Sequence, residues 1–259
     1  MNENPGFYRK EDFSLKLGKL TSELTASKAL SPAAEPSAIL LGGQSGAGKS
    51  TLHKIFLRKF NRNIVPINGD EYRSAHPRYR ELDRKFGIDS VKYTAPWAGA
   101  MTEALIDSLS KARYNLIVEG TLRTAETPTK TATLLKSRGY STSLALMAVK
   151  PEISLISCQI RYEEMRIAGT IPRATDPAHH AKIIEAIVDN IAELETTDLF
   201  ESIELYDRSE KCLFSSRNDQ GKASDAMRKA LFGEWTSEEK DHYAQLQDKL
   251  EALKRVGAQ

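Results

Sequence analysis

The chain has 259 residues, and its 37 basic and 35 acidic side chains leave a net charge of only +2 at pH 7. This balance gives no electrostatic reason to expect binding to nucleic acid or to a membrane surface. The first residues are polar, and no run of about 20 apolar residues could span a bilayer, so we expect a cytoplasmic protein.

Short apolar runs alternate with longer amphipathic stretches along the chain. A helical pattern over 9–28 and a linker rich in proline and alanine over 29–37 come first. The short runs predict strands at 38–41, 63–67, 114–118, 141–149 and 202–206. Helical spacing recurs at 49–60, 98–112, 127–138, 152–167 and 178–200. This alternation predicts an α/β fold of three layers, in which helices cover both faces of a mostly parallel sheet.

The segment after the first predicted strand matches the phosphate-binding pattern G-x-x-x-x-G-K-[ST] in full. Its residues are Gly43, Gln44, Ser45, Gly46, Ala47, Gly48, Lys49 and Ser50, with Thr51 next. Backbone N–H groups of such a loop surround phosphate oxygens, and the following helix adds its positive end. Lys49 is predicted to contact the β- and γ-phosphates of ATP, and Ser50 to bind Mg²⁺.

This motif predicts a P-loop NTPase-type fold, and we expect one kinase domain over 1–259. Residues 1–36 would form an N-terminal helix and linker, and 37–210 the α/β core. A segment near 161–177, rich in glycine, proline and charge, is predicted to act as a lid. Residues 222–259 are predicted to form a charged helical extension.

Polar side chains follow further predicted strands, where ligands bind in open α/β sheets. Asp70 follows the second strand and is interpreted either as the general base of phosphoryl transfer or as the N-cap of a helix over 71–79. Glu119, Thr121 and Arg123 follow the third strand. Arg161 and Arg173 flank the predicted lid, as phosphate clamps or as surface residues.

The motif by itself leaves two classes of function open. A small-molecule kinase needs a base aimed at an acceptor alcohol, which Asp70 would supply. A nucleotide-gated binding protein needs no such base. The adjacent residues His179 and His180 have no third metal ligand at a suitable spacing, so a surface or capping role is expected for them.

Several strings in order resemble the zeta toxin family of bacterial toxin–antitoxin systems, in particular its chromosomal branch. They are LLGGQSGAGKST, NGDEYRSAHPRY, IVEGTLRT, IRYEE and LFGEW. The resemblance implies an ATP- and Mg²⁺-dependent kinase that phosphorylates the 3′-hydroxyl of the amino sugar in UDP-N-acetylglucosamine and so blocks cell-wall precursor synthesis. It also implies a helical antitoxin partner that obstructs the nucleotide site.

The resemblance further assigns roles to single residues. Lys49 and Ser50 would hold the phosphates and the metal, Asp70 would be the base, and Arg161 and Arg173 would clamp the phosphates of ATP. Contacts with the sugar nucleotide fall to Glu103, Glu119, Thr121, Arg123 and Thr131. A related kinase that acts on another hydroxyl, in another UDP-sugar, an NAD ribose or an antibiotic, is the alternative.

Overall fold

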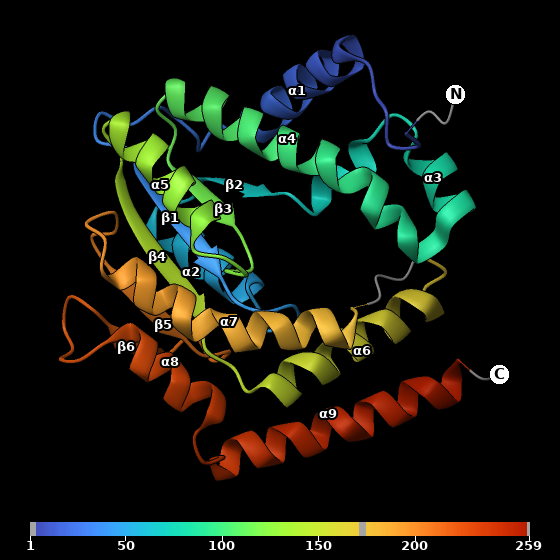
Figure 1. Cartoon of the computed structure of the whole chain (residues 1–259), viewed down its shortest axis with the longest axis vertical. Coiled ribbons are helices and arrows are strands. Elements are labelled where there is room, and N and C mark those ends of the chain that lie inside the picture. Colours follow the sequence, from blue (N-terminus) through green and yellow to red (C-terminus); the bar gives the residue numbers. More distant parts are fainter. Residues whose placement is uncertain (1–3, 171–174, 258–259) are drawn as a thin grey trace.

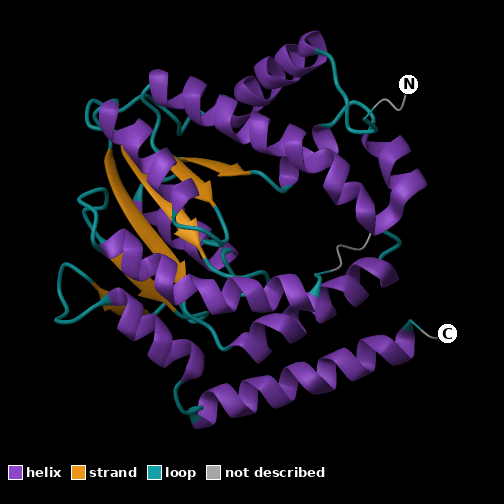
Figure 2. Ribbon diagram, in the orientation of Figure 1, coloured by secondary structure: helices purple, strands orange, loops and turns teal. Residues whose placement is uncertain are grey.

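A computed structural model describes residues 4–170 and 175–257. Within these residues six strands form one sheet in the order β2-β3-β1-β4-β5-β6 (Figure 2). The strands are β1 (Ser37–Gly42), β2 (Val65–Asn68), β3 (Leu116–Glu119), β4 (Ser141–Met147), β5 (Ile203–Tyr206) and β6 (Cys212–Ser215). The first five pair in parallel, and β6 pairs antiparallel with β5.

Both faces of this sheet are buried, as the side chains of β1 illustrate. Ala38 and Leu40 belong to one hydrophobic cluster, whereas Ile39 and Leu41 belong to another. Successive side chains of a strand point to opposite faces, so each face needs its own covering layer. The predicted three-layer α/β fold with a mostly parallel sheet is confirmed.

Two groups of helices supply these layers (Figure 1). The cluster around Leu40 is covered by α1 (Lys10–Thr25), α4 (Ser90–Lys111), α5 (Glu126–Ser137), α7 (Pro177–Glu195) and α8 (Ala223–Phe232). The other face is covered by α2 (Ser50–Lys59), α6 (Pro151–Ile167) and α9 (Ser237–Val256). Between β2 and α4 lie η1 (Glu71–Ala75), α3 (Tyr79–Phe86) and η2 (Gly87–Asp89).

Helix α4 begins at Ser90, earlier than the predicted start at residue 98, and Pro96 lies inside it. Proline usually ends a helix because it lacks an N–H donor. Here the flanking side chains of Thr94 and Trp97 are buried, and the indole N–H of Trp97 donates to the Tyr72 carbonyl at 3.1 Å. Tertiary packing therefore allows the helix to continue past Pro96.

The C-terminal part also differs from the sequence-based expectation. Residues 222–257, the described part of this region, contain two helices, and the first of these, α8, buries Met227 and Leu231 in the core. Thr236 is the N-cap of α9 and forms a capping box with Glu239. This cap marks the start of a helix separate from α8. Strand β6 was not predicted at all. None of the described helices combines the length and the apolar character needed to cross a membrane.

Candidate active site

A cleft with a volume of about 1380 Å³ opens at the carboxyl ends of β1, β2 and β3. The structure brings most of the predicted site residues together in its wall. They are Ser45, Gly46, Gly48, Lys49, Ser50, Thr51, Asp70, Glu103, Glu119, Thr121, Arg123, Thr131 and Arg161. Gly43, Gln44 and Ala47 do not line the cleft, and Arg173 lies outside the described residues.

The side chain of Gln44 points away from the cleft. It is buried, and its Nε2 donates to the Val149 carbonyl at 2.8 Å and to Ser154 Oγ at 3.2 Å. Ser154 Oγ in turn lies 2.9 Å from Nε2 of His180. His180 is buried, so the surface role expected for it is wrong. This network fixes the start of the loop to α6 and α7, so a contact between Gln44 and phosphate would have to come from its backbone.

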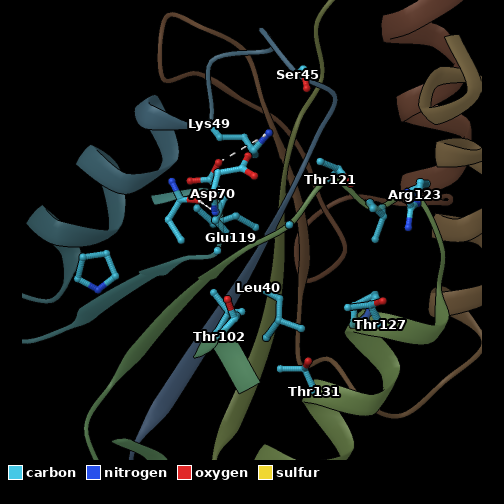
Figure 3. Close-up of a pocket in the computed structure, with 18 of the residues that line it drawn as sticks. Leu40, Ser45, Lys49, Asp70, Thr102, Glu119, Thr121, Arg123, Thr127 and Thr131 are labelled. Atoms are coloured by element: carbon cyan, nitrogen blue, oxygen red, sulfur yellow. Dashed lines mark hydrogen bonds and ion pairs between the residues drawn. The ribbon is translucent and has the colours of Figure 1, made fainter. Parts of the chain in front are cut away.

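Lys49 lines the cleft, with its side chain only 12% exposed. Its ammonium donates to the Gly43 carbonyl at 2.9 Å and lies 3.8 Å from Glu119 Oε1. Burial lowers the pKa of Lys49, while the negative charges of Glu119 and Asp70 oppose this shift and Arg161 adds to it. These residues therefore share one electrostatic site, and Figure 3 shows Lys49, Asp70 and Glu119 gathered there.

Glu119 has a second partner that sequence reasoning missed. Its Oε2 accepts a hydrogen bond from Nε2 of His53 at 2.9 Å, and both side chains are 18% exposed. His53 follows Lys49 by four residues, so the two side chains lie on the same face of α2. The four-residue spacing from Lys49 is the sequence signal that would have identified His53 as a site residue. The carboxylate is held between a histidine and the phosphate-loop lysine.

Asp70 lies just after β2, with its side chain 65% exposed. Asp70 occupies the N-cap position of η1, which ends at Ala75 and not at the expected residue 79, but its side chain makes no capping hydrogen bond. Instead Oδ1 accepts from Arg73 Nε at 3.0 Å, and Arg73 also donates to the Val91 carbonyl at 3.2 Å. The backbone N–H of Asp70 donates to Asn68 Oδ1 at 3.1 Å. The carboxylate is therefore oriented, yet open to a ligand.

A second group of polar side chains lies on α4, α5 and the loop after β3. Thr121 and Arg123 lie on that loop, and Thr131 lies on α5 (Figure 3). Between the first two, Leu122 has a positive φ of 56°, a rare conformation for this residue type. Asn190 of α7 donates to its carbonyl at 2.9 Å and supports this conformation. Glu103 of α4 pairs with Lys130 of α5 at 3.2 Å, and both residues line the cleft.

The donor set suits a magnesium ion that also binds phosphate. Ser50 begins α2 and lines the same cleft as the carboxylates of Asp70 and Glu119. Oxygen is the ligand that Mg²⁺ prefers. In the described part of the chain, no three His, Cys, Asp or Glu side chains form a group able to hold an ion. An ion here would therefore depend on Ser50 together with phosphate oxygens of a nucleotide.

Comparisons with known proteins show the family to which this chain belongs. The Zeta toxin family model matches residues 21–219. Toxin PezT of Streptococcus pneumoniae serotype 4 (strain ATCC BAA-334 / TIGR4) is 47% identical over 235 residues, which cover 90% of this chain and 92% of that protein. Toxin zeta of Streptococcus pyogenes is 38% identical over 182 residues, which cover 70% of this chain and 63% of that protein.

Solved structures agree with the sequence relatives. A chain from the PezAT chromosomal toxin–antitoxin system of Streptococcus pneumoniae aligns with a TM-score of 0.89 at 42% identity, over 96% of this chain and 98% of that one. A chain of the AvrRxo1-ORF1:-ORF2 structure with ATP aligns with a TM-score of 0.64 at 14% identity, over 96% and 87% of the two chains, which shows the fold alone. The resemblance stated above is confirmed: this chain belongs to the zeta toxin family.

Proposed function

We propose that the chain is the toxin of a toxin–antitoxin pair and acts as an ATP-dependent kinase. Its acceptor would be the 3′-hydroxyl of the amino sugar in UDP-N-acetylglucosamine. The single observation that carries this proposal is the electrostatic site in the cleft, where the lysine of a complete phosphate-binding loop faces the carboxylates of Asp70 and Glu119. A binding protein that only senses a nucleotide has no use for a carboxylate aimed at an acceptor.

The order of the strands supports a division of the cleft into two sides. The phosphate-binding loop follows β1, whereas Asp70 follows β2 and Glu119 follows β3, which lie on one side of β1 in the sheet. ATP bound at the loop would therefore present its γ-phosphate toward these carboxylates. The acceptor would lie among Glu103, Thr121 and Arg123, with its reacting hydroxyl next to Asp70.

Each side chain has a physical task in this proposal. Lys49 and Arg161 place positive charge beside the transferring phosphoryl group, which stabilises its charge in the transition state. Asp70 takes the proton of the sugar hydroxyl as the bond from that oxygen to the γ-phosphorus forms and the bond from the γ-phosphorus to ADP breaks. Arg73 keeps the Asp70 carboxylate in position. Mg²⁺ on Ser50 would neutralise charge on the β- and γ-phosphates. Arg173 is proposed as a second phosphate clamp.

The family also suggests a partner. PezT belongs to the PezAT toxin–antitoxin system, so we propose that an antitoxin protein restrains this chain in its host. The open cleft offers the simplest way to do so, because a protein segment that covers Lys49 and Ser50 would exclude ATP.

The substitution Asp70→Asn tests the kinase proposal. It keeps the size of the side chain and removes its charge, so ATP should bind nearly as in the parent while phosphoryl transfer slows at least about 10²-fold. The assay pairs calorimetry of ATP binding with mass spectrometry of a panel of UDP-sugars incubated with ATP and Mg²⁺. The panel also separates UDP-N-acetylglucosamine from other acceptors.

Asp189→Asn is the matched control, because Asp189 lies on α7 with its side chain 82% exposed and does not line the cleft. It should leave both measurements unchanged. A parental rate of product formation in Asp70→Asn would refute the base role. Loss of ATP binding in that variant would instead assign Asp70 to the nucleotide or its metal.

A further inference from the structure

Arg208 contacts the phosphate-binding loop from outside the sequence motif. It lies just after β5, and its side chain lines the same cleft. Its Nε donates to the carbonyl of Ala47 at 3.3 Å, and its Nη2 donates to the carbonyl of Gly46. The aliphatic part of the side chain approaches to 3.5 Å of the position that a Cβ on Gly48 would occupy. One arginine thus forms hydrogen bonds with two successive residues of the loop and lies beside the next one, Gly48.

The turn that carries Arg208 is fixed by its neighbour. Asp207 Oδ1 accepts hydrogen bonds from the N–H groups of Ser209 and Lys211, at 2.9 and 3.0 Å, and from Ser209 Oγ at 2.7 Å. The Asp207 carboxylate is therefore used within the turn and does not neutralise the arginine. On the other side, Ser157 Oγ of α6 accepts from Arg208 Nη2 at 2.9 Å.

The charge of Arg208 has neutral partners only. Its bonds go to two backbone carbonyls, to the Ser157 hydroxyl and, at 3.5 Å, to the His242 ring of α9. Within the described ranges it forms no ion pair with a carboxylate. A guanidinium stays protonated under all ordinary conditions. A half-buried positive charge beside the loop thus remains to attract an anion, which a role confined to packing would not require.

These bonds also set the orientation of two peptide groups. A trans peptide is planar, so holding the carbonyl oxygens of Gly46 and Ala47 also fixes the directions of the next two N–H groups, those of Ala47 and Gly48. The Ala47 N–H donates to the Gln44 carbonyl at 3.1 Å and so shapes the loop itself, which leaves the Gly48 N–H for a ligand. N–H groups of such a loop are the donors that it offers to phosphate. The contacts of Arg208 therefore act on the part of the loop that binds the ligand.

We propose that Arg208 is a positioning residue for nucleotide binding, which holds residues 46–48 of the loop in the conformation that accepts phosphates. The proposal rests on the nucleotide site of the proposed function and not on the identity of the acceptor. It assigns to the turn after β5 a part in binding the phosphates of ATP. Along the chain, this turn lies farther from the loop than any of the site residues predicted from the sequence.

The test uses two variants of the full chain and no acceptor. Arg208→Met keeps the aliphatic contact with Gly48 and removes the hydrogen bonds. Arg208→Lys keeps a charge, but a single ammonium lacks the planar fork that reaches both carbonyls and Ser157. Arg217→Met is the matched control, because Arg217 follows β6, is 53% exposed and pairs with Glu201 away from the cleft.

Calorimetry with Mg²⁺ then gives the dissociation constants of ATP and of tripolyphosphate, which occupies the loop without a nucleoside. In Arg208→Met both should weaken by a similar factor of about 10 to 100, the effect of losing hydrogen bonds from a charged group. Arg208→Lys should lose most of the same affinity, and Arg217→Met should match the parent.

Parental affinities in Arg208→Met would overturn the proposal, as would a lower melting temperature with unchanged dissociation constants, which would indicate a purely structural role. Weaker ATP binding with unchanged tripolyphosphate binding would overturn it too, by assigning Arg208 to the nucleoside. If the parent itself bound neither ligand, the nucleotide site and the role of Arg208 would both be refuted. Failure of acceptor phosphorylation alone, with these binding results intact, would contradict only the proposed function.

Discussion

Gly46 occupies a variable position of the phosphate-binding motif, yet the structure leaves room only for glycine there. Its φ of +77° lies in the left-handed region. A Cβ at this position would lie 2.0 Å from the carbonyl oxygen of Ser154 and 2.7 Å from Sγ of Cys158, both on α6. Since the nearer atom belongs to the backbone, rotation of a side chain cannot relieve the contact. The loop or the helix must shift.

The cost of Gly46→Ala has two parts, which a matched control separates. The left-handed conformation costs an alanine about 1–2 kcal/mol. Displacement of packed backbone adds about 1–3 kcal/mol. Gly139 has nearly the same φ, +76°, with no atom within 4 Å of its Cβ position, so Gly139→Ala should show the first part alone. We therefore expect about 1–2 kcal/mol for Gly139→Ala and about 2–5 kcal/mol for Gly46→Ala.

Urea unfolding gives both free energies, and calorimetry gives the affinity for ATP. Only Gly46→Ala should also weaken ATP binding, because only its methyl group forces the phosphate-binding loop and α6 apart. Adding Cys158→Ala should recover little stability, since the contact with the Ser154 backbone would remain. The reasoning is refuted if Gly46→Ala is as stable as Gly139→Ala and binds ATP like the parent.

Three further predictions concern single side chains. Lys49→Met should reduce phosphoryl transfer at least about 10²-fold, measured as phosphorylated product. It should not lower the melting temperature without nucleotide, because burial already disfavours the charge that it removes; a large decrease would contradict this. Arg161→Met should lower kcat more than it raises KM for ATP, and a change in KM alone would make Arg161 a ground-state clamp. Burial lowers the pKa of His180 below its ordinary value of 6.5. Just below pH 6.5 the unfolded chain therefore binds more protons than the folded chain. The free energy of unfolding should fall as the pH drops through 6.5 toward the lower folded-state pKa. His180→Asn should make this slope shallower by up to about 1.4 kcal/mol per pH unit in urea unfolding between about pH 7.5 and about pH 5.5, and an unchanged slope would refute the assignment.

The sequence alone was enough to predict the five parallel strands of the sheet and the phosphate-binding loop. Apolar runs such as 38–41 are buried on both faces, so they are recognisable without knowledge of their neighbours. The loop is a continuous segment whose function depends on its local backbone conformation and on the helix that follows. The residues of the motif therefore predict both the loop conformation and the helix. The same reasoning placed Asp70 and Glu119 at the carboxyl ends of strands, where the structure has them.

Other features depended on contacts between distant segments. Strand β6 is only four residues long, and Cys212 and Leu213 within it are exposed, so no apolar pattern marks it. Pro96 would end a helix in isolation, and the buried Trp97 overrides that local preference. Tertiary packing determines that β6 and the first turns of α4 form, because the residues that stabilise them lie elsewhere in the sequence.

The site shows the same division between local and tertiary information. The motif identifies Lys49 as a phosphate ligand, because the lysine acts where the chain itself places it. Nothing in the motif indicates that Gly46 must remain glycine, since the obstructing carbonyl belongs to Ser154 on another helix. Nothing near Arg208 in the sequence indicates the loop that it contacts. Sequence determines a site directly where its parts are consecutive, and folding alone determines which distant side chains complete it.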